Sequence, residues 1–219
     1  LVDPTLIAKA SISLDRELGA PIEAFRASNT TLSLSKLIDL PKDVGLLTPI
    51  IFGGLPTHDE DRYYLSYRGS LGTGVSLVND DIFTFRGGMH ALGGGVSLAA
   101  ARNFFGYTHS REGAYANRLW VMGAGVQLIY TLLDKVSFIG SFRNNLNWTY
   151  EGRNNDEYEL AGTIQYVAPQ GIRFSLKTAT SDRTFQYDQV TANVHLYKPE
   201  NTLVMFSIGY APVYETVTQ

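Results

Sequence analysis

Basic side chains stand at the polar positions of several segments in which polar and apolar residues alternate. Arg143 is one of them, in residues 136–151, where Val136 and Phe138 alternate with Ser137. Successive side chains of a strand point to opposite faces, so such a base shares its face with the polar residues. The residues expected on this polar face are Arg68, Arg86, His90, Arg143, Glu159, Arg173 and Lys177, with Asp15 as a second acid. Charged rings inside a pore set its ion preference, so this set predicts a constriction biased towards anions.

The same residues allow an interpretation that involves no pore. A barrel of about eight strands has an interior just wide enough for its own side chains. The arginines would then pair with carboxylates such as Glu159 and bond the strands to one another. Conductance and reversal potentials in a salt gradient separate the two interpretations, because only an open lumen can show anion selectivity.

Other kinds of site find little support in the sequence. Cysteine is absent, and no spacing of His, Asp and Glu suggests a metal centre. The glycine runs 87–88 and 93–95 are followed neither by a Lys-Ser/Thr pair nor by a helical segment, so they match no phosphate-binding loop. The net charge is −3, and no basic block indicates nucleic acid. We therefore expect no metal, no cofactor and no nucleic acid.

Residues 62–90 contain a long alternation that dominates the predicted fold. The apolar positions are Tyr63, Leu65, Tyr67, Leu71, Val75 and Leu77, and the residues between them are polar or small. This period of two is typical of a strand with one apolar face. Residues 79–81, Asn-Asp-Asp, have turn chemistry, after which Phe83 and Phe85 resume the alternation. We predict a hairpin that turns at 79–81, followed by a single bulged strand that continues to residue 101.

The rest of the chain divides into further alternating segments. We predict strands at 5–15, 29–40, 46–54, 118–133, 136–151, 157–168, 172–177, 190–196 and 204–210. Short turns are expected at 134–135, 169–171 and 198–201, and longer polar loops at 55–61, 102–117, 152–156 and 180–187. No linker-like change of composition interrupts the 219 residues. A single domain is therefore expected over 1–219, with the strands least clearly marked in 1–61.

Strand length and composition bear on the environment of these segments. The arm that begins at residue 62 is about sixteen residues long, whereas soluble strands usually have about five or six. Hydrophobic residues make up 44% of the chain, and the mean hydropathy is −0.06. No apolar run approaches the roughly 18 residues of a membrane helix, which excludes a helical membrane protein. A membrane barrel is compatible with this composition, since its strands mix lipid-facing and lumen-facing residues.

Short turns and longer loops alternate along the chain, as they do at the two ends of bacterial outer-membrane barrels. In this respect the sequence resembles the outer-membrane β-barrel superfamily over nearly all its length. The resemblance implies an all-β fold, an antiparallel up-and-down transmembrane β-barrel of about ten to twelve strands in the bacterial outer membrane. It implies a narrow porin-like channel for small polar or anionic solutes, or the membrane component of a transport or export assembly. The lipid bilayer is the implied partner, together with a protein partner or further copies of the chain.

In such a barrel the apolar faces meet lipid, and aromatic residues mark their ends. The lipid-facing aromatic residues are expected to be Tyr63, Tyr67, Trp120, Tyr130, Trp148, Tyr150, Tyr158, Tyr166 and Tyr210. A charge on this face, as in Leu71→Arg, should disrupt membrane assembly, whereas Ser70→Arg on the other face should be tolerated.

The end of the chain departs from the superfamily pattern. Members generally finish with a strand that carries a C-terminal aromatic residue, whereas this chain ends YAPVYETVTQ. In addition, the predicted strand count leaves the last strand finishing on the long-loop side. Either a closing strand is missing or the predicted count is wrong.

Three alternatives compete with a channel. A soluble lipocalin-like barrel or β-sandwich would turn its apolar faces inward, but polar faces rich in Ser, Asn, Thr and Gly rather than Lys and Glu argue against it. A structural or adhesion barrel would bind a partner through its long loops. An outer-membrane lipid hydrolase is the third, because His109, Ser110 and Asn117 resemble the His/Ser/Asn region of outer-membrane phospholipases. Neighbouring strand residues face opposite ways, so His109 could activate Ser110 only within a loop, and we expect no catalysis.

Overall fold

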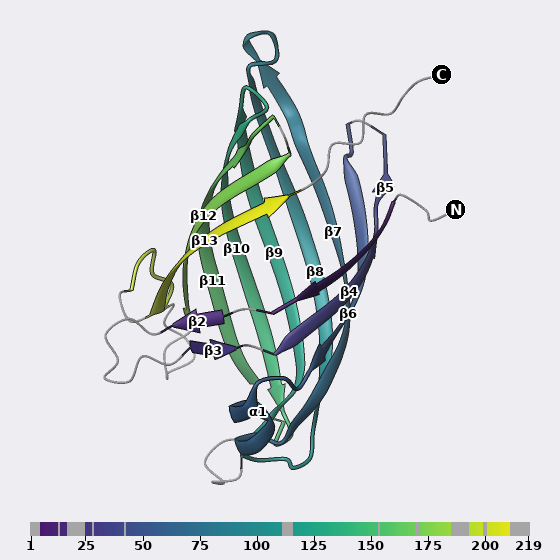
Figure 1. Ribbon diagram of the computed structural model, residues 1–219, viewed down its shortest axis with the longest axis vertical. Helices are drawn as coiled ribbons and strands as arrows, with labels where there is room; N and C mark the ends of the chain where they lie inside the picture. Colours follow the sequence, from purple (N-terminus) through teal and green to yellow (C-terminus); the bar gives the residue numbers. More distant parts are fainter. Residues whose placement is uncertain are drawn as a thin grey trace.

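One antiparallel β-sheet holds nearly all of the regular structure (Figure 1). The computed structural model describes residues 5–12, 14–16, 25–27, 29–41, 43–110, 116–152, 154–169, 171–184, 193–198 and 201–210. Within these residues, ten strands follow one another across the sheet in the order β1, β4, β6, β7, β8, β9, β10, β11, β12 and β13. The predicted all-β, antiparallel class is therefore confirmed.

The strands along this path differ greatly in length. They are β1 (Leu6–Ser11), β4 (Thr30–Lys36), β6 (Leu46–Leu55), β7 (Tyr67–Phe85), β8 (His90–Phe105), β9 (Arg118–Leu132), β10 (Val136–Thr149), β11 (Asn154–Val167), β12 (Ile172–Arg183) and β13 (Thr202–Tyr210). The short β5 (Ile38–Asp39) pairs with β6, and β2 (Leu14–Arg16) pairs with β3 (Phe25–Ala27) in a separate ribbon. Helix α1 (Asp59–Tyr64) precedes β7, and the 3-10 turn η1 (Arg86–Gly88) separates β7 from β8.

The sheet is open in the described part of the chain, so its closure into the predicted barrel stays a prediction. Strand β1 pairs with β4 and strand β13 pairs with β12, and the two are the edges of the sheet. The sheet nevertheless curls, so that β1 and β13 both come round in front of β8 and β9 (Figure 1). Alternation along a strand identifies its two faces but carries no information on whether the first and last strands meet.

The connections differ at the two ends of the sheet. Short turns join β7 to β8, β9 to β10 and β11 to β12 at one end, which we call the short-turn end. Longer connections, 56–66, 106–117 and 184–201, lie at the opposite, long-loop end. In the turn between β9 and β10, Leu133 and Asp134 both have φ of 53°, and the Lys135 amide donates to the Leu132 carbonyl at 3.1 Å. This turn is centred one residue earlier than predicted.

The turn predicted at residues 79–81 is a bulge inside β7. The Asp81 amide donates to the Asn79 side-chain oxygen at 3.0 Å, which is the local bonding that suggested a turn. The ladder with β8 continues on both sides of the bulge, and residues 80–82 oppose the single Gly93. A Cβ atom on Gly93 would lie 2.3 Å from the Asn79 carbonyl oxygen, so the bulge requires glycine here. The chain reverses at η1 instead, and the predicted continuous strand through the glycine runs is wrong.

Two predicted strands at the long-loop end are also wrong. Residues 59–64 form α1, so the first arm of the hairpin begins only at Tyr67. Of the strand predicted at 190–196, residues 193–196 form no strand, and residues 190–192 lie outside the described residues. Among the described residues, the next strand after β12 is β13, which ends at Tyr210, opposite Ile172. The last strand thus finishes at the short-turn end and not on the long-loop side.

The N-terminal part shows a smaller difference. The strand predicted at 5–15 ends at Ser11, and residues 14–16 belong to the separate β2. The side chain of Asp15, expected on the polar face, lies outside the described part of the chain. The strand predicted at 29–40 is interrupted between β4 and β5.

The ladder registers define two faces of the sheet. We call the face that carries Val126 of β9 the apolar face, and the face that carries its neighbour Gln127 the polar face. Leu98, Val126 and Phe206 on the apolar face are 61%, 55% and 65% exposed. On the polar face, by contrast, Ile129 and Ala161 are buried. The more exposed face is therefore the apolar one, the reverse of a sheet that packs on its own core.

Candidate functional site

A row of small and charged residues crosses the polar face. The registers place Thr48, Ser76, Ser97, Gly125, Arg143, Glu159 and Ser181 opposite one another on consecutive strands from β6 to β12. We call these seven residues the polar row. Its members on β6 to β9 are small, whereas those on β10 and β11 are long and charged. The row is therefore flat from β6 to β9, whereas Arg143 and Glu159 project charged groups from the sheet.

Arg143 and Glu159 of the polar row form a cluster of three ionisable side chains together with Lys177 of β12. Arg143 and Glu159 are direct cross-strand partners. Lys177 of β12 donates its Nζ to Glu159 Oε1 at 2.6 Å, and both side chains are roughly one-third exposed. Ion pairs with this exposure contribute only about 0–1 kcal/mol to stability. Two cations flank one carboxylate, so the main consequence is one net positive charge at the centre of the polar face.

A second ion pair lies towards the long-loop end. Arg118 of β9 binds both oxygens of Glu157 of β11, with Nη1–Oε2 at 3.0 Å and Nη2–Oε1 at 2.5 Å. This ion pair crosses β10, which lies between β9 and β11, and it holds the two side chains in a bidentate geometry. The sequence analysis did not single out either residue. The position of Glu157 two residues before Glu159 could have identified it as a residue of the polar face, because residues two apart in a strand share one face.

The polar row borders a hollow of about 290 Å³. Its lining includes Ser76, Ser97, Gly125, Gln127, Ser141, Arg143 and Glu159. The glycines leave the space that long side chains fill, since a Cβ on Gly123 would lie 2.9 Å from Arg143 Nη2. The guanidinium therefore lies close over the β9 backbone. Hydroxyl, amide and guanidinium groups together can hydrogen-bond water or a small polar or anionic solute.

The residues predicted for the polar face divide into two groups. Arg143, Glu159, Arg173 and Lys177 all lie on it, because they follow the uninterrupted registers of β10 to β12. That they line a lumen stays a prediction.

The other three residues predicted for that face depart from the regular alternation that the prediction assumed. Arg86 is exposed in the turn η1. His90 lies on the apolar face, where its Nδ1 is 2.6 Å from the Tyr130 hydroxyl. Arg68 occupies a bulge at the start of β7, with its guanidinium beside Gly106. Each of these errors follows from the misplaced turn or from a bulge, because either one breaks the alternation on which the prediction depended.

Five of the nine aromatic residues predicted to face lipid occupy the apolar face, namely Trp120, Tyr130, Trp148, Tyr158 and Tyr166. Trp120 is the direct partner of Trp148, and Tyr130 that of Phe138. Tyr166 stacks on Phe174, with ring centroids 6.4 Å apart.

The predictions for Tyr63, Tyr67, Tyr150 and Tyr158 need correction. Tyr63 lies in α1. Tyr67 pairs with Phe105 on the polar face, and Tyr150, beyond the end of β10, also packs on the Phe105 ring at 6.3 Å. Tyr158 is on the apolar face but is only 1% exposed, because residues 193–198 cover it. The side chain of Tyr210 lies outside the described part of the structure.

His109 takes part in a hydrogen-bonded chain at the long-loop end. Its Nε2 is 2.7 Å from Glu151 Oε1, and its Nδ1 is 2.9 Å from the Thr108 hydroxyl. The order carboxylate, imidazole, hydroxyl is that of an activated nucleophile. Both ring nitrogens are thereby occupied by partners other than Ser110, the residue that the sequence analysis considered.

Groups of His, Asp and Glu that could hold a metal ion do not occur in the described part of the chain. No helix among the described residues is long and apolar enough to cross a membrane. Comparisons with protein-family models, with curated proteins and with solved structures gave no match for this chain.

Proposed function

We propose that the protein is an outer-membrane β-barrel whose polar face lines a narrow channel. The observation that carries the proposal is the exposed apolar face and its aromatic borders. On β9 this face runs from Trp120 through Met122, Val126 and Leu128 to Tyr130 without a charged side chain. Exposed apolar surface of this extent is rare on soluble monomers and marks contact with lipid or with another protein.

The spacing of the aromatic residues suits a bilayer. Trp120 and Tyr130 are ten residues apart, or about 33 Å along a strand. At the usual barrel tilt of about 35–45° this distance spans about 25 Å along the membrane normal, the height of the apolar band of outer-membrane barrels. Trp148 opposite Trp120 and Phe138 opposite Tyr130 extend both borders to β10. The two aromatic borders therefore match the girdles expected at the two interfaces.

Closure of the sheet into a barrel is part of this proposal. The path holds ten strands, and β1 and β13 run in opposite directions, so pairing between them would be antiparallel. Because the chain lacks cysteine, Ala8→Cys combined with Val204→Cys or with Phe206→Cys provides a clean cross-linking test. We expect an intramolecular disulfide in lipid or detergent. Cross-links only between chains would mean that the edges pair between copies.

The cluster around Glu159 supports a preference for small anions. Its single net positive charge lies beside the hollow bordered by the polar row, where a passing ion would meet it at short range. Glu159 is the group that limits this preference, since it offsets one of the two cations. The preference should therefore change in opposite directions when the acid or a base of the cluster is neutralised.

The experiment is single-channel recording of the purified full chain in a planar bilayer, with reversal potentials in a KCl gradient. We expect a small, anion-selective conductance, increased selectivity in Glu159→Gln and decreased selectivity in Lys177→Gln. Ser141→Ala is the matched control, because it lines the same hollow without changing the charge. Absence of conductance would contradict the channel, and cation selectivity would contradict its preference for anions; either result leaves the membrane barrel untouched.

The chain of Glu151, His109 and Thr108 favours a second candidate function, hydrolysis of an ester at the long-loop end. In this role His109 would remove the Thr108 proton, and Glu151 would orient the imidazole. Hydrolysis of a short-chain nitrophenyl ester should then disappear in Thr108→Val and persist in Ser110→Ala. Equal activity in both variants would exclude this function.

A further inference from the structure

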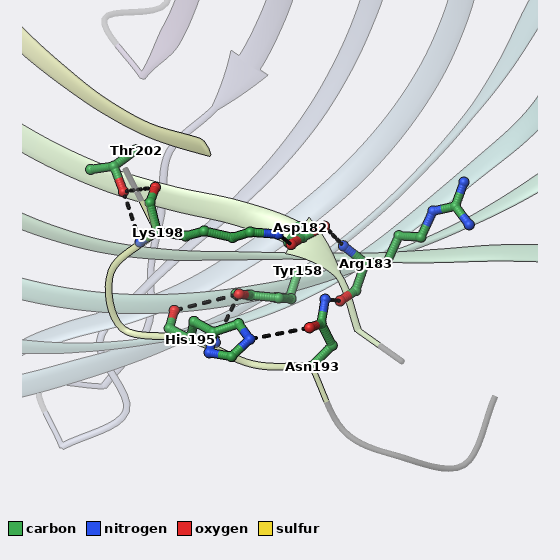
Figure 2. Close-up of polar contacts among 7 residues, drawn as sticks. All are labelled: Tyr158, Asp182, Arg183, Asn193, His195, Lys198 and Thr202. Atoms are coloured by element: carbon green, nitrogen blue, oxygen red, sulfur yellow. Dashed lines mark hydrogen bonds and ion pairs between the residues drawn. The ribbon is translucent and has the colours of Figure 1, made fainter. Parts of the chain in front are cut away.

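A short segment lies against the apolar face at the long-loop end (Figure 2). We call residues 193–198 the strap. The His195 amide donates to the Tyr158 hydroxyl at 2.8 Å, and this hydroxyl lies 3.4 Å from the His195 carbonyl oxygen. The Thr180 hydroxyl donates to the Leu196 carbonyl at 3.3 Å. The strap backbone thus bonds directly to side chains of β11 and β12.

Both ends of the strap are also held. Lys198 Nζ pairs with Asp182 Oδ2 at 2.5 Å, and the Thr202 hydroxyl donates to the Lys198 carbonyl at 2.7 Å. The Asn193 side-chain amide donates to the Arg183 carbonyl at 3.1 Å. Figure 2 shows Asn193, His195 and Lys198 beside Tyr158, Asp182 and Arg183. The strap is therefore fastened along its length and is not a free loop.

These bonds have a consequence for the apolar face. Tyr158 and Thr180 are 1% and 2% exposed, although both stand on the face whose other side chains are open. Without the strap, the Tyr158 hydroxyl would be presented on the apolar surface, where an unsatisfied polar group is costly. The Thr180 hydroxyl would keep its hydrogen bond with the Thr202 hydroxyl at 2.9 Å. The strap thus satisfies the Tyr158 hydroxyl at the border of the apolar face.

The outward side of the strap has the opposite character. Leu196 is 86% exposed and Tyr197 68%, and Val194 is exposed as well. The backbone polar groups of this segment turn towards the sheet while its apolar side chains turn away from it. This arrangement continues the apolar face outward over polar side chains of β11 and β12.

We propose that the strap is a lipid-contacting element that places Leu196 and Tyr197 in the outer part of the bilayer. The proposal rests on the proposed membrane location of the sheet. Lipid is the occupant favoured over a protein because the strap is continuous with the apolar face below it, where Leu160 and Ile164 follow Tyr158 along β11. A tyrosine next to an exposed leucine also suits the border between hydrocarbon and headgroups, since its ring is apolar and its hydroxyl is wet.

Tryptophan fluorescence in vesicles with brominated acyl chains tests the strap and the sheet separately, because bromine quenches tryptophan on contact. The background is Trp120→Phe with Trp148→Phe, and Leu196→Trp is the reporter of the strap. Tyr107→Trp is the control, as its side chain is also highly exposed, at 62%, at the same end but in the connection after β8. A chain that keeps only Trp120, through Trp148→Phe alone, reports on the sheet.

We expect loss of intensity and a shift to shorter wavelength for Leu196→Trp and for the chain with Trp120, and neither for Tyr107→Trp. Quenching of Trp120 without quenching of Leu196→Trp would overturn the strap proposal and leave the membrane sheet standing. A short-wavelength emission of Leu196→Trp without quenching would mean that protein, including a second copy of the chain, covers the strap, which also overturns the proposal. No quenching of Trp120 would overturn the proposed function itself.

Circular dichroism and cooperative thermal unfolding show whether each variant retains the sheet. If Leu196→Trp fails to fold, Tyr197→Trp in the same background replaces it, because the Tyr197 side chain is also exposed and takes no part in the hydrogen bonds between His195 and Tyr158. The expected quenching is the same, and its absence in the folded variant would overturn the strap proposal.

Discussion

The two faces of one sheet differ in how closely they are packed. On the polar face, a Cβ on Gly72 would lie 2.4 Å from the Phe52 ring, and Gly123 and Gly93 are covered just as closely. On the apolar face, a Cβ on Gly140 would have no atom within 4 Å. The side that packs within the chain is thus the polar one, and the apolar side depends on surroundings that the chain does not supply.

This difference indicates where the stability of the sheet comes from. Soluble sheets bury their apolar face and leave the polar face to water. Here the hydrogen-bonded strands, the covered glycines and the ion pairs of the polar face supply the internal contacts. The apolar face gains free energy only when lipid or another apolar surface replaces water. Three substitutions test this contrast between the faces.

The largest effect is expected for Val126→Arg on the apolar face, about midway between Trp120 and Tyr130. In a bilayer this change should cost about 2–4 kcal/mol of folding free energy, because it places a charge against hydrocarbon near the midplane. Gln127→Arg, one residue away on the polar face, is the control and should cost much less. Denaturant titration of vesicle-bound protein measures both. Equal costs would mean that the apolar face does not meet lipid.

Val126→Arg and Gln127→Arg compare the two faces more directly than Leu71→Arg and Ser70→Arg do. The Ser70 hydroxyl accepts a hydrogen bond from the Gly54 amide at 3.0 Å, so Ser70→Arg would also break a contact within the sheet.

An intermediate effect is expected for Gly93→Ala. The added methyl group would meet the backbone of the bulge in β7, which has to shift, and over-packing of this kind costs about 1–3 kcal/mol. Gly140→Ala on the open apolar face should be neutral or stabilising by up to about 1 kcal/mol, because it reduces the freedom of the unfolded chain. Thermal unfolding of the two variants compares them directly. A neutral Gly93→Ala would show that the bulge is not as tightly covered as described.

The smallest effect is expected for Asp182→Asn at the border of the apolar face, at the long-loop end of β12. Lys198 Nζ lies 2.5 Å from Asp182 Oδ2, and this ion pair is lost when the carboxylate is neutralised. Asp182→Asn should therefore cost up to about 1 kcal/mol at pH 7.

The measurement compares the unfolding free energies of wild type and Asp182→Asn at pH 7 and at about pH 3. The difference between the two proteins should shrink at the lower pH, because the wild-type carboxyl then begins to lose its charge. A difference independent of pH would show that altered hydrogen bonding, and not the loss of the ion pair with Lys198, causes the effect.

The sequence analysis was most accurate where the ladder is uninterrupted. Strands β9, β10 and β11 lie close to their predicted ranges, and Arg143 and Glu159 share the polar face as expected. Alternation over more than ten residues leaves little freedom for the face of each side chain, since a slip of one residue would reverse every position.

The errors are concentrated where local chemistry admits two outcomes. The Asn79 side chain bonds the Asp81 amide in a bulge as readily as in a turn, and only the long ladder with β8 decides between them. Residues 193–196 alternate like a strand, yet they bond to Tyr158 and Thr180 across the face of the sheet. Tyr63 lies in a six-residue helix that no period of the sequence indicated.

The sequence by itself determined the all-β class, the two faces of the central strands and the separation of apolar from polar side chains, because these properties follow from a period of two along each strand. Tertiary structure decided the place of the turn at η1, the cover over Tyr158 and the open edges at β1 and β13. Those features depend on hydrogen bonds between residues far apart in the chain, and no local pattern specifies which distant strand or side chain will supply the partner.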